Sequence, residues 1–402
     1  MNKPWKYPKI GSRMHLQVSG ESLTSAVPNP LRKKAMANMV SPYEMQIIQI
    51  DITNKCDLAC SNCTRLLENQ NAFWEMTPEN FRLAVRSLEG FPGVIGMMGG
   101  NPAMHRNFEE LCDIFVEEVP NKNQRGLFTN NIFKHADIAK KVFGFINANT
   151  HGSQHGIKSL EPVRSHALYH WGYSSHSPLL TTGKDLFEEE EMWDRISKCD
   201  VNHEWSASIV QNRGKLRAYF CEVAASFDLA QGTDNGIDPV PGWWRRNVSE
   251  FEDQIALFCP GCGVPAKLKG HMDYEETDTY TSSNADLALK SLNKKRNIIE
   301  LIGMQGNATI DHKVTDYSQR KIARAKQKFK YRVRSLFYRD VLKYLRQMSY
   351  ELKRSSARGA SPASKALLSS RPQSTVTSPK PMTIPNASSG SPTIEKVDAA
   401  IH

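Results

Sequence analysis

Three cysteines near the N-terminus have the spacing of a metal-binding loop. Cys56, Cys60 and Cys63 are separated by three and then two residues, and they directly follow the apolar run 47–52. Thiolates select zinc or iron–sulfur clusters among the metals that proteins bind. A structural zinc site uses four ligands, whereas three ligands leave one coordination position open to a substrate or cofactor. The loop therefore predicts a catalytic metal centre.

The pattern CxxxCxxC after a first strand resembles that of the radical S-adenosylmethionine (SAM) superfamily. The resemblance implies a 4Fe-4S cluster on Cys56, Cys60 and Cys63, with SAM chelating the fourth iron. It also implies reductive cleavage of SAM to methionine and a 5′-deoxyadenosyl radical. Asn62 departs from the family pattern, in which an aromatic or apolar residue near the adenine precedes the third cysteine.

Polar or glycine-rich turns follow the next expected strands. The turn after strand 94–98 resembles the family's GGEP motif. The resemblance implies that its glycines let the backbone approach SAM closely and that the side-chain carbonyl of Asn101 accepts a hydrogen bond from the SAM ammonium group. Thr129 and Asn130 resemble the pair at the family's third strand, although an ordinary turn is an equal alternative. Asn149 and His151 end a fourth strand and are candidates to contact SAM or substrate. The expected SAM contacts are Gly99, Gly100, Asn101, Pro102, Thr129, Asn130 and Asn149.

Strands alternate with helices after residue 43, which is typical of a parallel α/β sheet or barrel. Thr77, Pro78 and Glu79 mark the start of the first such helix. The resemblance implies an α/β fold whose first domain is a partial (β/α)6 barrel over 43–185, preceded by an N-terminal arm over 1–42. Segment 160–183, rich in histidine and aromatic residues, is a candidate to close the barrel mouth over a substrate or, alternatively, to form a packed strand and loop of the last barrel units.

Four further cysteines form a second set, Cys199, Cys221, Cys259 and Cys262. Cys112 lies on the apolar stripe of an expected helix and is interpreted as a small buried hydrophobe. The runs 204–210 and 216–223 predict a β-hairpin. This arrangement resembles the SPASM/Twitch auxiliary-cluster extension, so we expect a small cysteine-rich domain over 186–280 with a second iron–sulfur cluster. Structural zinc is the alternative, although zinc ribbons use two CxxC pairs and this region has one.

The basic charge is concentrated near the C-terminus. The 402 residues carry a formal charge of +10. Segment 317–354 contains thirteen Lys and Arg residues and two acidic residues, so the rest of the chain is close to neutral. We expect a helix over 285–302, a helical, basic extension over 281–354 and a disordered Ser/Pro-rich tail over 355–402. The basic helix could contact nucleic acid, an anionic membrane or an acidic partner, or pack on its own core.

The sequence predicts a radical SAM enzyme that abstracts hydrogen from an unidentified substrate, with a lean toward a peptide or protein. A flavodoxin or ferredoxin would supply the electron. The grouped cysteines and the lack of a signal-peptide core indicate a cytoplasmic protein. Two alternatives remain: a zinc-stabilised nucleic-acid-binding protein, and a non-catalytic iron–sulfur protein that retains the fold.

Overall fold

The computed structural model describes residues 29–170, 172, 174–290 and 297–301. These residues form a seven-stranded sheet with the order β5-β4-β3-β2-β1-β6-β7. Every neighbouring pair is parallel except β6 and β7, which are antiparallel. The strands are β1 (Ile47–Asp51), β2 (Val94–Met98), β3 (Arg125–Thr129), β4 (Phe145–Asn149), β5 (Leu168–His170), β6 (Ser206–Asn212) and β7 (Lys215–Tyr219). The predicted parallel α/β sheet is thus present.

Strand β1 lies in the interior of the sheet. Ile48, Gln49 and Ile50 are each fully buried, so both faces of the strand are covered. A parallel strand covered on both faces is expected to be apolar along most of its length, as the run 47–52 is. Its carboxyl end leads directly into the three-cysteine loop, which is therefore held by a buried strand of the main sheet.

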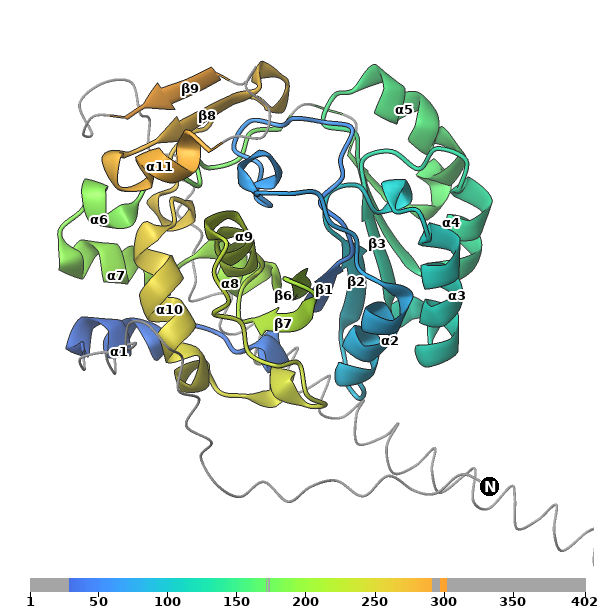
Figure 1. The fold of residues 1–402 in the computed structure, drawn as a ribbon, viewed down its shortest axis with the longest axis horizontal. Coiled ribbons are helices and arrows are strands. Elements are labelled where there is room, and N and C mark those ends of the chain that lie inside the picture. Colours follow the sequence, from blue (N-terminus) through green and yellow to red (C-terminus); the bar gives the residue numbers. More distant parts are fainter. Residues whose placement is uncertain (1–28, 171, 173, 291–296, 302–402) are drawn as a thin grey trace, which may run out of the picture. The chain divides into compact units, whose positions relative to one another are not determined.

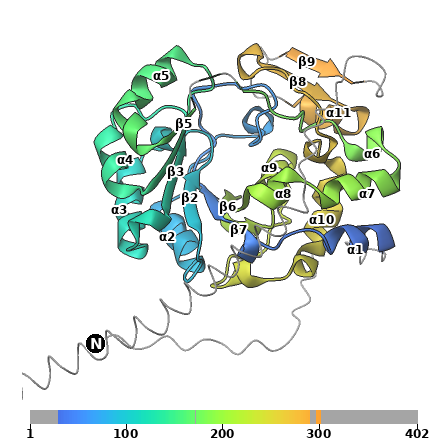
Figure 2. The ribbon, with the colours of Figure 1, turned by 180° about the vertical axis from the view of Figure 1, so that it is seen from behind.

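Helices that connect the parallel strands lie together on one side of the sheet (Figures 1 and 2). They are α2 (Pro78–Ser87), α3 (Phe108–Glu118), α4 (Ala136–Val142) and α5 (Gln154–Leu160). The predicted start of α2 is confirmed, since Thr77 is its N-cap and the Thr77 hydroxyl accepts a hydrogen bond from the backbone N–H of Asn80 at 3.2 Å.

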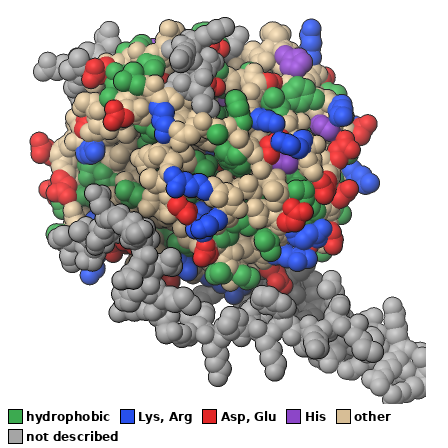
Figure 3. Space-filling view, in the orientation of Figure 1, with side chains coloured by type: hydrophobic (Ala, Val, Ile, Leu, Met, Phe, Trp, Pro, Cys, Tyr) green, Lys and Arg blue, Asp and Glu red, His purple; other side chains and the backbone are tan. Residues whose placement is uncertain are grey.

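The later part of the chain lies on the opposite side (Figure 1). Its helices are α6 (Gly183–Leu186), α7 (Glu189–Ser197), α8 (Asp200–Glu204), α9 (Glu222–Gln231), α10 (Glu252–Phe258) and α11 (Ala285–Ala288). A separate two-stranded parallel sheet joins β8 (Thr277–Tyr280) and β9 (Asn297–Glu300). Acidic and basic side chains are interspersed over the face drawn in Figure 3, in keeping with a nearly neutral body.

The six-unit barrel expected over 43–185 is not confirmed. That segment supplies five strands, and the last, β5, has only three residues, of which Leu168 and His170 are exposed. The sixth parallel strand is β6, which lies beside β1 at the other side of the sheet. The predicted hairpin does form, but as the edge of the main sheet rather than in a separate auxiliary domain. Its first strand is largely buried and pairs with the otherwise open edge of β1.

Four expectations about the ends of the chain need correction or lie wholly or partly outside the described residues. The arm expected over 1–42 contains helix α1 (Pro30–Met36), whose Ala35 and Met36 are buried. The helix expected over 285–302 is confirmed only at its start, as α11, and is wrong at 297–300, which form β9. The β-branched pair at 298–299 favours a strand there. The basic helix 317–354 and the tail 355–402 lie outside the described residues. None of the helices in the described part is long and apolar enough to cross a membrane.

Candidate functional site

The three-cysteine loop is anchored to the turn after β2 by two backbone hydrogen bonds. The N–H of Gly100 donates to the carbonyl of Thr53, and the N–H of Asn101 donates to the carbonyl of Lys55, each at 2.7 Å. These bonds fix the chain up to the residue before Cys56. The direction in which the loop leaves the sheet is therefore set by backbone contacts between two neighbouring strand ends.

A cavity of about 590 Å³, here called the central cavity, lies at the carboxyl ends of β1 to β4. Its volume falls in the range of small-molecule and cofactor sites. Most of the residues expected to hold the first cluster and SAM line it: Cys56, Cys60, Cys63, Gly99, Gly100, Thr129, Asn130 and Asn149. His151 and, from the segment 160–183, His176 also line this cavity. The structure thus brings the first predicted site together in one place.

The two glycines after β2 are required by protein packing. A Cβ atom on Gly99 would lie 2.2 Å from the Thr53 carbonyl oxygen, and one on Gly100 would lie 2.2 Å from the Lys55 carbonyl oxygen. Gly99 also has a φ of +134°, which side chains rarely adopt. The expected reason for these glycines was close approach to a ligand. The contact that demands them is instead with the backbone leading into the cysteine loop.

Asn101 and Pro102 are buried and do not line the central cavity, contrary to expectation. The side-chain oxygen of Asn101 accepts a hydrogen bond from the Thr129 hydroxyl at 2.8 Å. The side-chain amide nitrogen of Asn101 donates to the Asp57 carboxylate at 3.2 Å. Asp57 also accepts from the amide of Asn130 at 2.7 Å. Asn101 therefore ties the ends of β2 and β3 to the cysteine loop instead of presenting a free acceptor to a ligand.

Asn62 has a local role that accounts for its departure from the family pattern. Its φ of +51° places it in the left-handed region, which Asn tolerates better than an aromatic or branched apolar residue does. Its backbone N–H donates to the Asp278 carboxylate at 2.6 Å, and its side-chain oxygen accepts from the N–H of Thr279 at 3.2 Å. Asn62 thus fastens the cysteine loop to β8.

A buried carboxylate holds two histidines at the cavity wall. Nδ1 of His151 lies 2.8 Å from Asp273, and Nδ1 of His176 lies 3.2 Å from it. Burial alone would raise the pKa of Asp273, but the contacts with His151 and His176 hold that pKa well below its usual range. Ligand atoms of Cys60, His151 and Asp273 all lie within 4.8 Å of one another. A charged, oriented group therefore stands beside one of the three cysteines.

A second buried charge cluster centres on Arg65. Nε of Arg65 lies 3.3 Å from Asp51, and its Nη1 lies 3.0 Å from Glu222. The Arg65 guanidinium also donates to Gln49 and to the sulfur of Met98. Burial raises the pKa of Asp51 to about 6, against the opposing effect of Arg65. This cluster connects the cysteine loop, the sheet and the start of α9.

The four cysteines of the second set surround one small cavity of about 30 Å³, here called the second cavity, whose other lining is mostly apolar. Cys199 and Cys221 are the N-cap residues of α8 and α9, while Cys259 and Cys262 flank a short 3-10 helix after α10. None of the four forms a disulfide. Residues separated by up to 63 positions are thus brought together as the sequence predicts.

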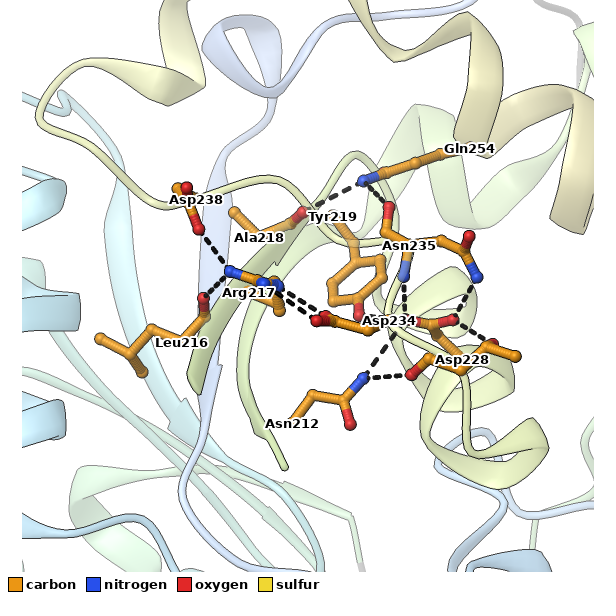
Figure 4. A network of polar contacts seen from close by, with 11 residues as sticks. Asn212, Leu216, Arg217, Ala218, Tyr219, Asp228, Asp234, Asn235, Asp238 and Gln254 are labelled. Carbon is orange, nitrogen blue, oxygen red and sulfur yellow. Dashed lines mark hydrogen bonds and ion pairs between the residues drawn. The ribbon is translucent and has the colours of Figure 1, made fainter. Parts of the chain in front are cut away.

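A polar network positions Cys221 and the helix that follows it (Figure 4). The buried Asp228 carboxylate accepts hydrogen bonds from the Tyr219 hydroxyl at 2.5 Å and from the Asn235 backbone N–H at 2.8 Å. Gln254 on α10 accepts from the N–H of Phe220 at 3.1 Å. The strand end before Cys221 is therefore fixed both to α9 and to the helix that leads into the CxxC pair.

The donor chemistry of both sets fits a bound metal centre. Burial raises the pKa of Cys56 to about 12 and that of Cys199 to about 11, and burial together with the neighbouring Cys199 raises the pKa of Cys221 to about 12. Burial and the nearby thiolates likewise hold the pKa of Cys259 well above its usual value. Thiolates gathered in this way need a cation to stabilise them. The sets therefore suit a metal or cluster better than they suit free thiolates.

Three residues of the site were not anticipated from the sequence: Arg65, Glu222 and Asp273. A weak signal existed for Arg65 and Glu222. Asp51 is a charged residue in a mostly apolar strand, and Glu222 is the single charged residue of the run 218–225. A charge within a buried element indicates a partner of opposite charge. Asp273 carries no such signal, because it lies in a polar loop and is brought to the cavity only by the fold.

Comparisons with known proteins are sparse. No family model and no curated protein matches the chain. Eight chains of solved structures match. Among them is BtrN, solved in complex with AdoMet and 2-DOIA, with 16% sequence identity and a TM-score of 0.36. That match covers 54% of this chain and 88% of BtrN. A likeness this distant carries no argument about function, so the proposals below rest on the chain's own residues.

Proposed function

We propose that the chain is a radical SAM enzyme, with Cys56, Cys60 and Cys63 holding a 4Fe-4S cluster in the central cavity. The observation that carries this proposal is that the three cysteines follow the end of one parallel strand and face the ends of β2, β3 and β4 across a single cavity. The bound cluster and SAM would supply reductive SAM cleavage and a radical able to abstract hydrogen. The substrate is a peptide, protein or smaller molecule that the cavity admits.

The residues that line the cavity would bind and orient SAM and substrate. Thr129, Asn130 and Asn149 offer hydroxyl and amide groups, and the backbone at Gly99 and Gly100 offers a close, side-chain-free surface. His151 and His176, held by Asp273, present oriented imidazoles to the same cavity. Such fixed polar groups favour a single bound geometry, which radical chemistry requires in order to avoid side reactions.

We further propose that Cys199, Cys221, Cys259 and Cys262 hold a second iron–sulfur cluster. All four would be ligands, so the cluster would transfer electrons or stabilise the fold rather than bind substrate. A flavodoxin or ferredoxin is the proposed reductant for the first cluster. Zinc at the second set is the competing assignment, and metal analysis separates the two.

Anaerobic reconstitution with metal counting and a SAM-cleavage assay tests these proposals. Three proteins are compared: wild type, the triple variant Cys56→Ala/Cys60→Ala/Cys63→Ala, and the double variant Cys259→Ala/Cys262→Ala. We expect iron for two clusters in wild type and about half in each variant. Formation of 5′-deoxyadenosine should vanish in the triple variant.

Each component of the proposal can fail separately. A wild-type protein that contains zinc and no iron would overturn the radical SAM assignment. Full iron in the double variant would exclude the second cluster but leave the first in place. A fully loaded wild type that never cleaves SAM with dithionite would point to a non-catalytic iron–sulfur protein.

A further inference from the structure

The ion pair between Arg65 and Glu222 joins the two cysteine sets. Nη1 of Arg65 lies 3.0 Å from the Glu222 carboxylate, and the exposed fractions of the two side chains are 3% and 5%. Arg65 stands two residues after Cys63, and Glu222 directly follows Cys221. A short, buried contact thus links the loop of the first set to a cysteine of the second.

We infer that Arg65 and Glu222 are positioning residues that couple the two proposed metal centres, fixing their relative placement and making the reduction potential of each depend on the same charge pair. This inference rests on the proposed function, since it requires both cysteine sets to hold redox-active clusters.

The surroundings of the pair support a role in placement. Glu222 also accepts a hydrogen bond from the Ser206 hydroxyl on β6, and Arg65 contacts Asp51 on β1 and the sulfur of Met98 on β2. The two charged groups are therefore oriented by three strands of the main sheet. A buried ion pair of this kind is weak evidence for stability, because desolvation offsets the attraction between the charges. The role assigned to the pair is therefore to constrain geometry rather than to add stability.

The separation between the two cavities supports an electrostatic role. Val201 and Val264 line both the central cavity and the second cavity, so a single layer of side chains separates the cavities there. Arg65 and Glu222 line the central cavity, while Cys221 lines the second. Charges in such a water-poor region act over longer distances than they do in water. Either charge should therefore be felt at both centres.

The sign of the effect follows from charge. Cluster potentials respond to the net charge around them. Removing the Glu222 charge favours the reduced, more negative form of each cluster and so raises both potentials. Removing the Arg65 charge has the opposite effect and lowers both. Each single substitution leaves the partner's charge unpaired, whereas the double variant removes both charges. The potential shift of the double variant should therefore differ from the sum of the two single-variant shifts.

The test is a redox titration, followed by electron paramagnetic resonance, of the full chain reconstituted anaerobically. The variants are Glu222→Gln, Arg65→Gln, the charge-conserving Arg65→Lys and the double variant. Cys259→Ala/Cys262→Ala and the triple Cys56→Ala/Cys60→Ala/Cys63→Ala backgrounds isolate the first and second centres in turn. Glu252→Gln is the control for an ion pair away from both cavities, since Glu252 pairs with Arg32 at 2.9 Å, is 40% exposed and lines neither cavity.

We expect Glu222→Gln to raise, and Arg65→Gln to lower, the potentials of both centres, while Arg65→Lys and Glu252→Gln stay near wild type. A shift at the second centre alone, or at neither, would overturn the coupling. If Glu222→Gln loses iron, loss from both sets supports the inference and loss from the second set alone contradicts it. A wild type without iron instead refutes the proposed function, which keeps the two failures distinct.

Discussion

The backbone N–H of Asn62 donates to the carboxylate of Asp278 at 2.6 Å, joining residues 216 positions apart. The contact fastens the turn between Cys60 and Cys63 to β8, which belongs to a different sheet. The cysteine loop is therefore held on one side by the strand end of β2 and on the other by β8. Its shape depends on residues from both ends of the described chain.

Substitution of Asn62 should separate the contribution of its backbone conformation from that of its side chain. Asn62→Ala loses the hydrogen bond to Thr279, worth about 1 kcal/mol, and strains the left-handed backbone by about 1–2 kcal/mol. Asn62→Gly loses the hydrogen bond without that strain. We expect the alanine variant to be the less stable in urea unfolding of the iron-free protein. Equal stability of the two variants would show that the backbone conformation costs nothing here.

Gly100 and Gly261 offer a matched pair of glycine substitutions, one in each cysteine region. In Gly100→Ala the new methyl group would collide with the Lys55 carbonyl, whereas in Gly261→Ala nothing lies within 4 Å of it. We expect Gly100→Ala to lose about half of the reconstituted iron and to unfold at a lower temperature. Gly261→Ala should match wild type in both measurements. Retention of full iron by Gly100→Ala would show that the cysteine loop can shift without losing its cluster.

Asp228 should be essential to the second cysteine set. Asp228→Asn turns a carboxylate that only accepts hydrogen bonds into a group with its own donors, facing Tyr219 and Asn235. Loss of a buried, charge-assisted hydrogen bond costs about 1.5–3 kcal/mol. We expect reduced stability and selective loss of iron from the second set. Asp238→Asn is the control, because Asp238 belongs to the same network but its side chain is 77% exposed (Figure 4).

Stability in acid should depend on Glu75. Burial alone would raise the pKa of Glu75, but hydrogen bonds from Arg106 and Lys55 outweigh it and lower the pKa to about 2 from 4.5. A depressed carboxyl pKa stabilises the fold above the unfolded-state value, and that stabilisation is lost as the pH falls through the folded-state value. Glu75→Gln should therefore be less stable than wild type at neutral pH.

The difference between Glu75→Gln and wild type should shrink between about pH 4.5 and pH 2, where the wild-type carboxyl becomes protonated. Denaturant unfolding of the iron-free proteins across this range measures it. A difference that stays constant with pH would mean that the lost interaction is steric rather than ionic.

The sequence predicted which cysteines gather better than it predicted the arrangement of the strands. Spacing identified the first set and the pair Cys259 and Cys262, because residues on one short loop or tight turn are close in any fold. Cys199 and Cys221 were grouped with that pair only because they were the cysteines that remained, and all four line one cavity. The position of β6 beside β1 could not be predicted, since periodicity identifies a strand but not its neighbour. The resemblance to an auxiliary extension therefore gave no sign that the hairpin would extend the main sheet.

Individual side chains near the site were the hardest to predict. Asn101 was expected to face a ligand, yet its carbonyl is taken by Thr129 of the next strand. Asp273 was not considered, because its two histidine partners lie about 100 residues earlier in the chain. Such contacts depend on the three-dimensional packing of distant segments, which residue types and spacing do not encode.

The pairing of β6 with β1 has a consequence for how the chain folds. Val40, just before β1, is hydrogen-bonded to Asn202, 162 residues further along, just before β6. Contacts between such distant segments slow folding, because a long loop must close before they form. On a ribosome, the first cysteine loop would emerge long before the strand that completes its sheet. The loop that carries the first set therefore waits on the nascent chain, without its completed sheet, until β6 has been made.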